Sequence, residues 1–262
     1  MKNYKDKTVL ITGASSGIGE SFAKQLDELG SKLILTARSE DKLNKLASQM
    51  NDAIVISGDL SDRKFPKKLY KEVKNKKLTV DIIINNAGFG YSGPFLDSEF
   101  SGYEEMLNLN VYSLMELTYL FMNDMLKRKS GGIINVSSLA SYQPLPYFAV
   151  YAASKSFVTS FSLSLHEEYR EKGINVLGVC PGYTKTNFNQ RAHLTPTNVP
   201  GYIMSSDKVV KQSLKAFSKK KFVIINGKIN LLARFFMAII PTGLAMRVSK
   251  RIIKGGMDKK RW

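Results

Sequence analysis

The chain has 262 residues, 44% of them hydrophobic and 23% charged, a composition typical of a globular protein and not of a disordered or fibrous one. Its single cysteine, Cys180, excludes an internal disulfide, and no uncharged run of about 20 apolar residues predicts a membrane-spanning helix. The formal charge of +17 is unevenly placed, because residues 208–262 carry 15 basic residues against one acid, Asp258.

Strand and helix patterns alternate along the chain. The N-terminal residues lack a signal-peptide pattern, so we expect a cytoplasmic protein. Short apolar runs typical of buried strands lie at Thr8–Thr12, Lys32–Thr36, 53–57, 80–84, 133–136, 174–179 and 222–225. Helical patterns lie at 17–29, 41–50, 62–75, 103–128 and 151–172, and an irregular stretch at 187–206 is predicted to cover a pocket. The alternation predicts an α/β fold with a doubly wound parallel sheet of the Rossmann type, a single domain over 1–225 followed by a basic, partly apolar C-terminal extension at 226–262.

A glycine-rich turn, Gly13, Gly17 and Gly19 in the string TGASSGIG, joins the first strand to the first helix. Glycines at this place allow a tight turn and let the backbone approach a pyrophosphate, which lies on the helix N-terminus. The position of the turn in the first βαβ unit therefore predicts a dinucleotide-binding site.

The second strand is followed by Arg38. An acid at this position would hold the 2′-hydroxyl of the adenosine ribose in NAD, whereas an arginine accommodates a 2′-phosphate. The residue therefore favours NADP(H) over NAD(H) as the cofactor.

Tyr151 and Lys155 lie four residues apart at the start of a predicted helix, so both side chains project from one face. A nearby ammonium favours phenolate, which lowers the pKa of a tyrosine toward the range of a general acid or base. Ser138 follows the strand at 133–136 and can meet Tyr151 at the carboxyl edge of the sheet, where open α/β folds bind ligands.

Six motifs in order resemble the short-chain dehydrogenase/reductases over about residues 7–225. They are the TGASSGIG turn, Asn85-Asn86-Ala87-Gly88, Ser138, Tyr151 with Lys155, Pro181-Gly182, and Thr186. The resemblance implies an oxidoreductase, such as a carbonyl reductase, that interconverts a carbonyl and an alcohol with NADP(H).

The same resemblance implies four catalytic residues. Tyr151 is the proton donor in reduction and the base in oxidation, and Lys155 lowers the pKa of this tyrosine and binds the nicotinamide ribose. Ser138 hydrogen-bonds the substrate oxygen, with Ser137 a less suitable alternative by spacing, and Asn110 holds a water, with Asn108 as its competitor. Cofactor contacts are implied for Gly13, Ser15, Ser16, Gly17, Ile18, Gly19, Arg38, Ser39, Asp59, Leu60, Asn86, Ala87, Gly88, Tyr151, Lys155, Pro181, Gly182, Thr184 and Thr186.

The role of Asn85 has two possible interpretations, and the histidines do not predict a metal site. Asn85 is either structural or on the adenosine side of the cofactor. No metal site is predicted, because His166 and His193 stand apart from other ligand types.

The predicted pocket walls favour a lipophilic carbonyl substrate over a sugar. They are largely apolar or aromatic: Gln143, Pro144, Tyr147, Phe148, Tyr183, Phe188, Ile203 and Met204, with the segment Phe89-Gly90-Tyr91 as a further candidate. By family analogy, helices 103–128 and 151–172 are expected to form a homodimer or homotetramer contact.

The segment 226–254 mixes apolar pairs with basic residues. It is either an interfacial element in peripheral contact with an anionic membrane, or a helix pair packed over the pocket or a partner subunit. Nucleic-acid binding is not expected, because the rest of the chain is nearly neutral. The rival to an enzyme is a non-catalytic NADP-binding sensor or regulatory protein, which would be expected to lack Tyr151 or Lys155.

Overall fold

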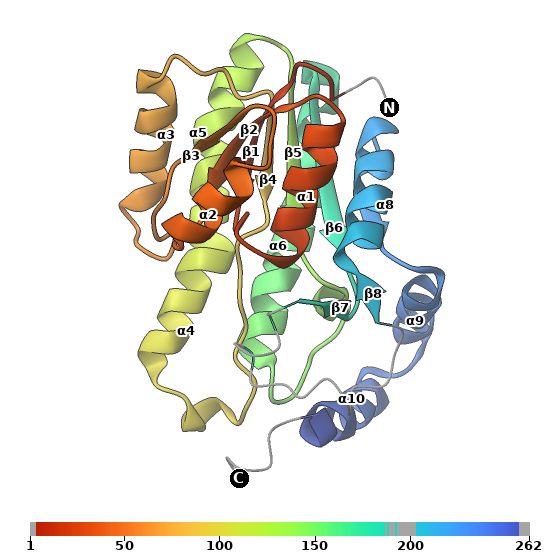
Figure 1. Ribbon diagram of the computed structural model, residues 1–262. Coiled ribbons are helices and arrows are strands. Elements are labelled where there is room, and N and C mark those ends of the chain that lie inside the picture. Colours follow the sequence, from red (N-terminus) through yellow and green to blue (C-terminus); the bar gives the residue numbers. More distant parts are fainter. Residues whose placement is uncertain (1–3, 187, 189–191, 193–202, 257–262) are drawn as a thin grey trace.

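Seven parallel strands form the centre of the molecule in the order β3-β2-β1-β4-β5-β6-β9 (Figure 1). This computed structural model describes residues 4–186, 188, 192 and 203–256. The strands are β1 (Thr8–Thr12), β2 (Lys32–Thr36), β3 (Ala53–Val55), β4 (Ile82–Asn85), β5 (Gly131–Val136), β6 (Ile174–Cys180) and β9 (Val223–Ile225). The predicted doubly wound α/β fold of the Rossmann type is confirmed, and each predicted strand is found with shifts of one or two residues at some ends.

The strands are apolar throughout because helices cover both faces of the sheet. Along β1, Val9 and Ile11 belong to one core cluster, whereas Leu10 belongs to the other. Leu10 is in register with Ile34 of β2 and Ile83 of β4, so a continuous apolar layer runs across the strands. All of these side chains are almost completely buried.

Three helices pack on each face of the sheet. One face carries α1 (Gly17–Glu28), α2 (Glu40–Ala47) and α8 (Ser206–Ser218), and the other carries α3 (Phe65–Asn75), α5 (Leu114–Lys127) and α6 (Ala149–Tyr169). The first group buries residues such as Phe22 and Leu214, and the second buries Leu69 and Phe121.

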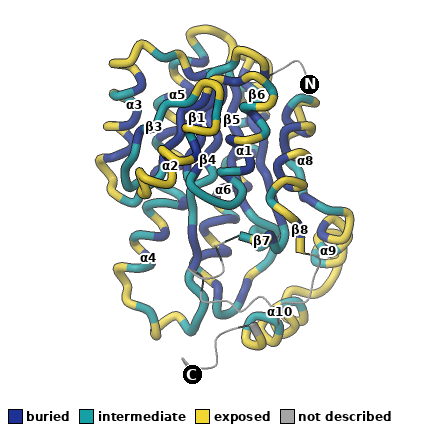
Figure 2. Tube along the Cα trace, in the orientation of Figure 1, coloured by how far each residue is buried: buried dark blue, intermediate teal, exposed yellow. Residues whose placement is uncertain are grey.

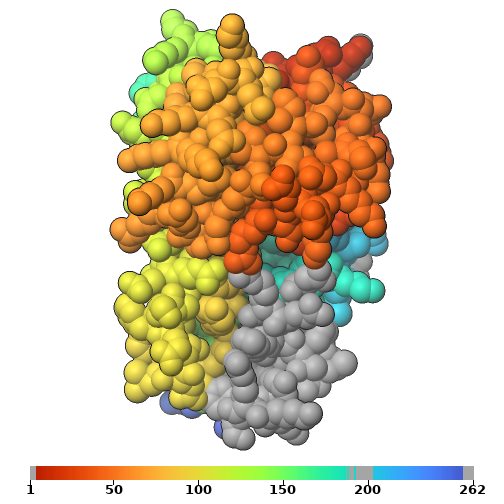
Figure 3. All heavy atoms as spheres, turned by 60° about the vertical axis from the view of Figure 1, so that its left-hand side comes forward, coloured from red at the N-terminus to blue at the C-terminus, as the bar shows by residue number. Residues whose placement is uncertain are grey.

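The predicted helix at 103–128 is divided by a wider turn. It consists of α4 (Phe100–Leu107), a π-helical segment at Asn108–Ser113 and then α5. Figure 3 shows α4 in yellow, below the orange surface that contains α2 and α3. Single π-turns are frequent at functional sites, and this one holds Asn110 with its side chain fully buried.

The C-terminal part contains elements that were not predicted from the sequence. These are α8 and the short parallel pair β7 (Thr184–Lys185) and β8 (Met204–Ser205). The two terminal helices, α9 (Lys228–Ile239) and α10 (Thr242–Gly256), lie where a helix pair was one of the two alternatives for 226–254. Short 3₁₀ turns lie at Phe95–Asp97, Leu139–Tyr142 and Arg170–Lys172. Most of the pocket-covering stretch expected at 187–206 lies outside the described residues. Within the described part of the chain, no helix is both long and apolar enough to cross a membrane.

Candidate active site

A cavity of about 660 Å³ opens at the carboxyl ends of the strands, where the strand order reverses between β1 and β4. Open α/β sheets bind ligands at this point because the connecting loops diverge to opposite faces. Nearly all of the expected site residues line it: Gly13, Ser15, Ser16, Gly17, Ile18, Arg38, Ser39, Asp59, Leu60, Asn86, Ala87, Gly88, Ser138, Tyr151, Lys155, Pro181, Gly182, Thr184 and Thr186. Only Gly19 and Asn110 of the expected set lie behind the cavity wall.

The glycine turn has the geometry of a phosphate cradle. Gly13 and Gly17 have φ angles of +64° and +60°, which residues with a Cβ adopt at a cost. The side chain of Ser16, the N-cap of α1, makes no capping hydrogen bond, so the first amide groups of the helix remain available to an anion at the cavity wall. Gly19 is structural, since a Cβ there would lie 2.2 Å from the Gly13 carbonyl oxygen.

Asn86 fastens this turn to β4. Its Nδ2 donates to the carbonyl oxygens of Thr12 at 2.9 Å and Gly13 at 3.2 Å, and its backbone N–H donates to Thr12 Oγ1 at 2.9 Å. Asn85 points elsewhere, donating to Thr118 Oγ1 and Asn135 Oδ1 within the core, so its role in the structure is packing.

The end of the cavity beside β2 carries two cations. The Arg38 guanidinium lies 3.7 Å from Asp59 Oδ2 and 3.5 Å from Glu105 Oε1, and it is about half exposed. Lys42, at the start of α2, lines the cavity beside Ser39 and was not predicted from the sequence. The sequence could have indicated Lys42, because it lies only four residues after Arg38, in the first turn of α2.

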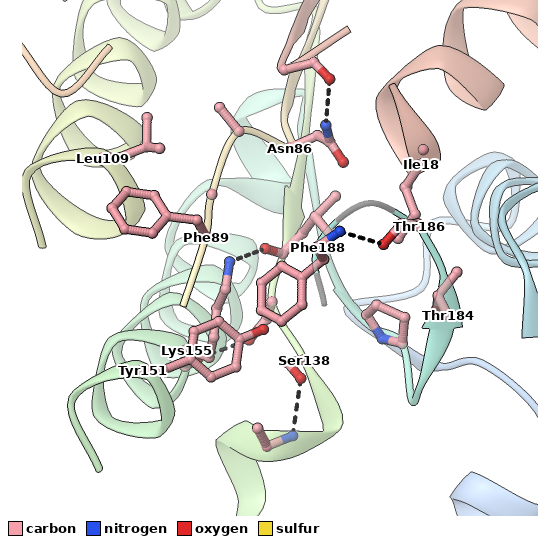
Figure 4. Close-up of a pocket in the computed structure, with 18 of the residues that line it drawn as sticks. Ile18, Asn86, Phe89, Leu109, Ser138, Tyr151, Lys155, Thr184, Thr186 and Phe188 are labelled. Carbon is pink, nitrogen blue, oxygen red and sulfur yellow. Dashed lines mark hydrogen bonds between the residues drawn. The ribbon is translucent and has the colours of Figure 1, made fainter. Parts of the chain in front are cut away.

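Tyr151, Ser138 and Lys155 meet at the opposite end (Figure 4). The Ser138 side chain lies close enough to the Tyr151 phenol to influence its pKa, and Ser138 Oγ accepts the backbone N–H of Ala140 at 3.1 Å. Lys155 Nζ lies 5.9 Å from the centre of the Tyr151 ring and donates to the Val136 carbonyl oxygen at 3.0 Å.

Burial governs the electrostatics of this trio. It raises the pKa of Tyr151 to about 12, with the Ser138 hydrogen bond acting in the opposite direction, and it lowers the pKa of Lys155 to about 8. The pKa of Tyr151 is therefore raised and not lowered as expected from the neighbouring ammonium, because desolvation by burial is the largest influence on the phenol. At neutral pH the phenol is therefore protonated, which is the form that can donate a proton.

Side-chain hydrogen bonds decide between Ser138 and Ser137 and between Asn110 and Asn108. Ser137 Oγ donates to the Lys155 carbonyl oxygen at 2.8 Å inside the core, so Ser138 is the serine that meets Tyr151. Asn110 exchanges hydrogen bonds with the Phe89 backbone and lies behind Gly88, next to Lys155: a Cβ on Gly88 would be 2.9 Å from Asn110 Oδ1 and 3.2 Å from Lys155 Nζ.

Asn108, the competitor of Asn110, instead accepts a hydrogen bond from Arg63 Nε at 3.0 Å, on the exposed side of the π-helical segment. That contact leaves Asn110 as the asparagine beside Lys155.

The segment after β6 forms another part of the cavity wall. Thr186 lies against the glycine turn, since a Cβ on Gly17 would be 2.9 Å from Thr186 Cγ2. Gly182 is covered by Asn230 of α9, whose Nδ2 would lie 2.3 Å from a Cβ at that position. Asn230 is buried and donates to the Asn226 carbonyl oxygen.

The substrate end has mainly apolar walls, in line with the predicted pattern. Of the expected wall residues, Gln143, Phe148, Tyr183, Phe188 and Phe89 line the cavity, whereas Pro144, Tyr147, Ile203, Met204, Gly90 and Tyr91 do not. The Tyr151 ring stacks on Phe148 with centroids 4.4 Å apart. Met237 of α9 and Ile253 of α10 also line the cavity, which agrees with the alternative of a helix pair packed over the pocket. The sequence did not identify these two residues, because long-range packing of a terminal helix leaves no local motif.

The described residues contain no group of three or more potential metal ligands. His166 Nδ1 contacts the Val176 carbonyl oxygen in the core, and His193 lies outside the described residues.

Comparisons with known proteins identify relatives of this chain in sequence and in fold. A family model described as short chain dehydrogenase matches residues 7–197. An uncharacterized oxidoreductase of Staphylococcus epidermidis is 32% identical over 206 residues, which cover 76% of this chain and 90% of that protein. A very-long-chain 3-oxoacyl-CoA reductase of Homo sapiens is 35% identical over 184 residues, covering 68% of this chain and 59% of the reductase.

Among solved structures, a short-chain dehydrogenase from Sphingobium yanoikuyae in complex with NADPH has a TM-score of 0.80 to this chain. The two are 28% identical, and the match covers 90% of this chain and 96% of the other.

Proposed function

Because the chain belongs to the short-chain dehydrogenase family, we propose that it reduces a lipophilic aldehyde or ketone to an alcohol with NADPH, and catalyses the reverse oxidation. The observation that carries the proposal is that Tyr151, Ser138 and Lys155 line one cavity, with the Lys155 ammonium 5.9 Å from the centre of the Tyr151 ring.

The residues present fit a dinucleotide. The uncapped start of α1 and the glycine turn would hold its pyrophosphate, and Arg38 with Lys42 would hold a 2′-phosphate. A phosphate there would compete with Asp59 and Glu105 for the Arg38 guanidinium. The two cations support NADP(H) as the cofactor, as does the NADPH complex of the Sphingobium relative.

The protein groups then act on the carbonyl oxygen. NADPH, when bound, supplies a hydride for the carbonyl carbon. Ser138 donates a hydrogen bond to the oxygen as negative charge develops on it, and Tyr151 transfers its phenolic proton to the same oxygen. Lys155 stabilises the resulting phenolate, because an ammonium within reach of the ring favours the charged form. In oxidation the proton moves in the opposite direction.

Apolar walls support a lipophilic substrate. The rings of Phe148 and Phe188 pack on the Tyr151 ring, and Phe89 and Leu145 line the same cavity. The human relative named as a very-long-chain 3-oxoacyl-CoA reductase makes 3-oxoacyl thioesters one class worth testing.

The proposal is tested by NADPH consumption with aliphatic aldehydes, bulky ketones, 3-oxoacyl thioesters and, as a polar control, sugars. We expect turnover of apolar carbonyls and little of sugars. Tyr151→Phe is expected to lower kcat about 10²–10⁴-fold with NADPH binding retained. Tyr70→Phe is the matched control, since this phenol bonds Asp124 far from the cavity. Normal turnover by the Tyr151→Phe variant would refute the assignment, and NADPH binding without turnover of any carbonyl would favour the sensor.

We also propose that the enzyme is a homodimer or homotetramer through α5 and α6. The exposed apolar side chains Met115, Tyr119 and Phe157 on these helices support this assembly. Sedimentation velocity that gives a monomer mass at micromolar concentration would contradict it.

A further inference from the structure

The outward side of α9 and α10, hereafter the C-terminal surface, has an unusual distribution of apolar and charged side chains. These helices lie beside each other at the edge of the molecule, remote from the sheet, and are largely exposed (Figures 1 and 2). Pro241 separates them. The surface therefore consists of two short helices, neither able to span a membrane.

The outward face of α9 is apolar. Six large apolar side chains on it are each between 54% and 64% exposed: Ile229, Leu231, Leu232, Phe235, Phe236 and Ile239. At 3.6 residues per turn they occupy one continuous arc, and the inward residues Asn230 and Met237 lie on the opposite side. A surface helix of a globular protein normally turns its polar face outward, so α9 is inverted.

The outward face of α10 is basic. It carries Arg247, Arg251 and Lys254, bordered by the exposed apolar residues Leu244 and Val248. Lys250 of the same helix lies with its Nζ 5.9 Å from the centre of the Tyr147 ring. Residues 228–256 contain no acid at all. Apolar and cationic faces thus lie side by side on adjacent helices.

This combination selects among the possible partners. A second copy of the same surface would bring the cations of two α10 helices together, which opposes pairing. A nucleic acid would use the cations but would leave Phe235 and Phe236 in water. An anionic lipid surface satisfies both, because apolar side chains enter the acyl boundary while basic groups meet headgroup phosphates.

We propose that the C-terminal surface docks the protein on anionic lipid membranes. The docking stands on α9 and α10 alone. A consequence that rests on the proposed function is that substrate enters from the bilayer, because Met237 and Ile253 of the same two helices line the catalytic cavity.

The test is flotation of the full-length protein with vesicles of phosphatidylcholine alone or mixed with phosphatidylglycerol. We expect binding to the anionic vesicles and little to the neutral ones, weakened at about 1 M salt, where the Debye length is about 3 Å. Replacing Arg247, Arg251 and Lys254 with Gln is expected to weaken binding about a hundredfold, since each cation contributes about fivefold at an anionic surface. Phe235→Ser and Phe236→Ser together are expected to weaken it by a similar factor.

Matched controls separate the C-terminal surface from general charge and apolarity. Replacing Lys64, which directly precedes α3, and Lys68 and Lys71 of α3 with Gln removes the same charge from another exposed face, and Leu96→Ser removes an apolar side chain that is 88% exposed. Both controls are expected to bind as wild type. Thermal melts and turnover of a water-soluble aldehyde check that every variant is folded.

Three results would overturn the docking proposal. One is equal binding to neutral and anionic vesicles, or to neither. Another is that the Phe235→Ser/Phe236→Ser variant still binds anionic vesicles as wild type does and that heparin displaces it, which would mean that binding depends on charge alone. The third is a wild-type dimer that the Phe substitutions convert to monomer, which would assign the apolar face to a second copy. Failure of docking with normal carbonyl reduction leaves the proposed activity intact.

Discussion

Lys155 offers a prediction in which stability and activity change in opposite directions. Its side chain is 4% exposed, and burial lowers its pKa to about 8. A lysine in the unfolded chain has a pKa of about 10.4, so holding the ammonium in the folded state at pH 7 costs about 3 kcal/mol. Lys155→Met removes this cost and also the hydrogen bond to the Val136 carbonyl oxygen, worth about 1 kcal/mol. The variant is expected to be about 2 kcal/mol more stable at pH 7.

The sign of the pH dependence identifies the cause. The folded pKa is below the unfolded one, so the destabilisation is complete below pH 8 and disappears as pH rises toward 10.4, where both states hold neutral lysine. Thermal or urea unfolding of the ligand-free proteins measures the difference, and 2 kcal/mol corresponds to about 4–8 °C in Tm. The gain of the variant over wild type should shrink to about zero, or below, near pH 10.5.

Lys211→Met is the control, because it removes an exposed lysine from the same strongly basic protein. It should change stability by less than about 0.5 kcal/mol. A Lys155→Met variant that is no more stable than wild type at pH 7, or whose gain is the same at pH 7 and 10.5, would refute the reasoning about buried charge. The same variant should lose carbonyl reduction, because it can no longer stabilise the phenolate of Tyr151.

Three further predictions concern the cofactor and the proton. Arg38→Asp should weaken NADPH binding at least about tenfold and NADH binding much less, and Lys42→Gln should show a smaller effect in the same direction; a wild type that prefers NADH would contradict both. Because burial raises the pKa of Tyr151 to about 12, alcohol oxidation should rise about tenfold per pH unit between pH 6 and 7, where Lys155 with its pKa of about 8 is still charged, while reduction stays nearly constant; a flat oxidation profile over this range would exclude this phenol as the base. Gly182→Ala should lower both Tm and turnover, because its Cβ would meet Asn230 Nδ2 at 2.3 Å; combining it with Asn230→Ala should restore part of the Tm, and a normal single variant would contradict the contact.

Most of the fold could be predicted from local patterns in the sequence. A buried parallel strand is recognisable because its apolar run is continuous, as at Thr8–Thr12, and every such run identified in the sequence is a strand of the sheet. The glycine turn and the tyrosine–lysine pair are equally local, so their placement in one cavity follows once the sheet is parallel.

Features set by distant contacts were not predictable in this way. The π-helical segment at Asn108–Ser113 reads as ordinary helix, since the hydrogen bonds of Asn110 to the Phe89 backbone are invisible in the sequence. The direction of the pKa change at Tyr151 was also missed, because the i,i+4 spacing shows the cation but not the desolvation. Met237 and Ile253 reach the cavity only because α9 and α10 fold back on it.

The C-terminal helices contact the wall of the catalytic cavity at Gly182. This contact would connect docking at a membrane surface with the catalytic cavity. Asn230, in the first turn of α9, fills the space that a side chain on Gly182 would need, and Gly182 lies in the cavity wall next to Thr184. Interior packing transmits displacements because it leaves few voids. A force that moves α9, including docking of its apolar face on a lipid surface, therefore acts on the wall of the catalytic cavity through Asn230. Coupling of this kind predicts that anionic vesicles change the KM for apolar carbonyls in wild type but not in the Phe235→Ser/Phe236→Ser double variant, even when the carbonyl is too water-soluble to partition into the bilayer.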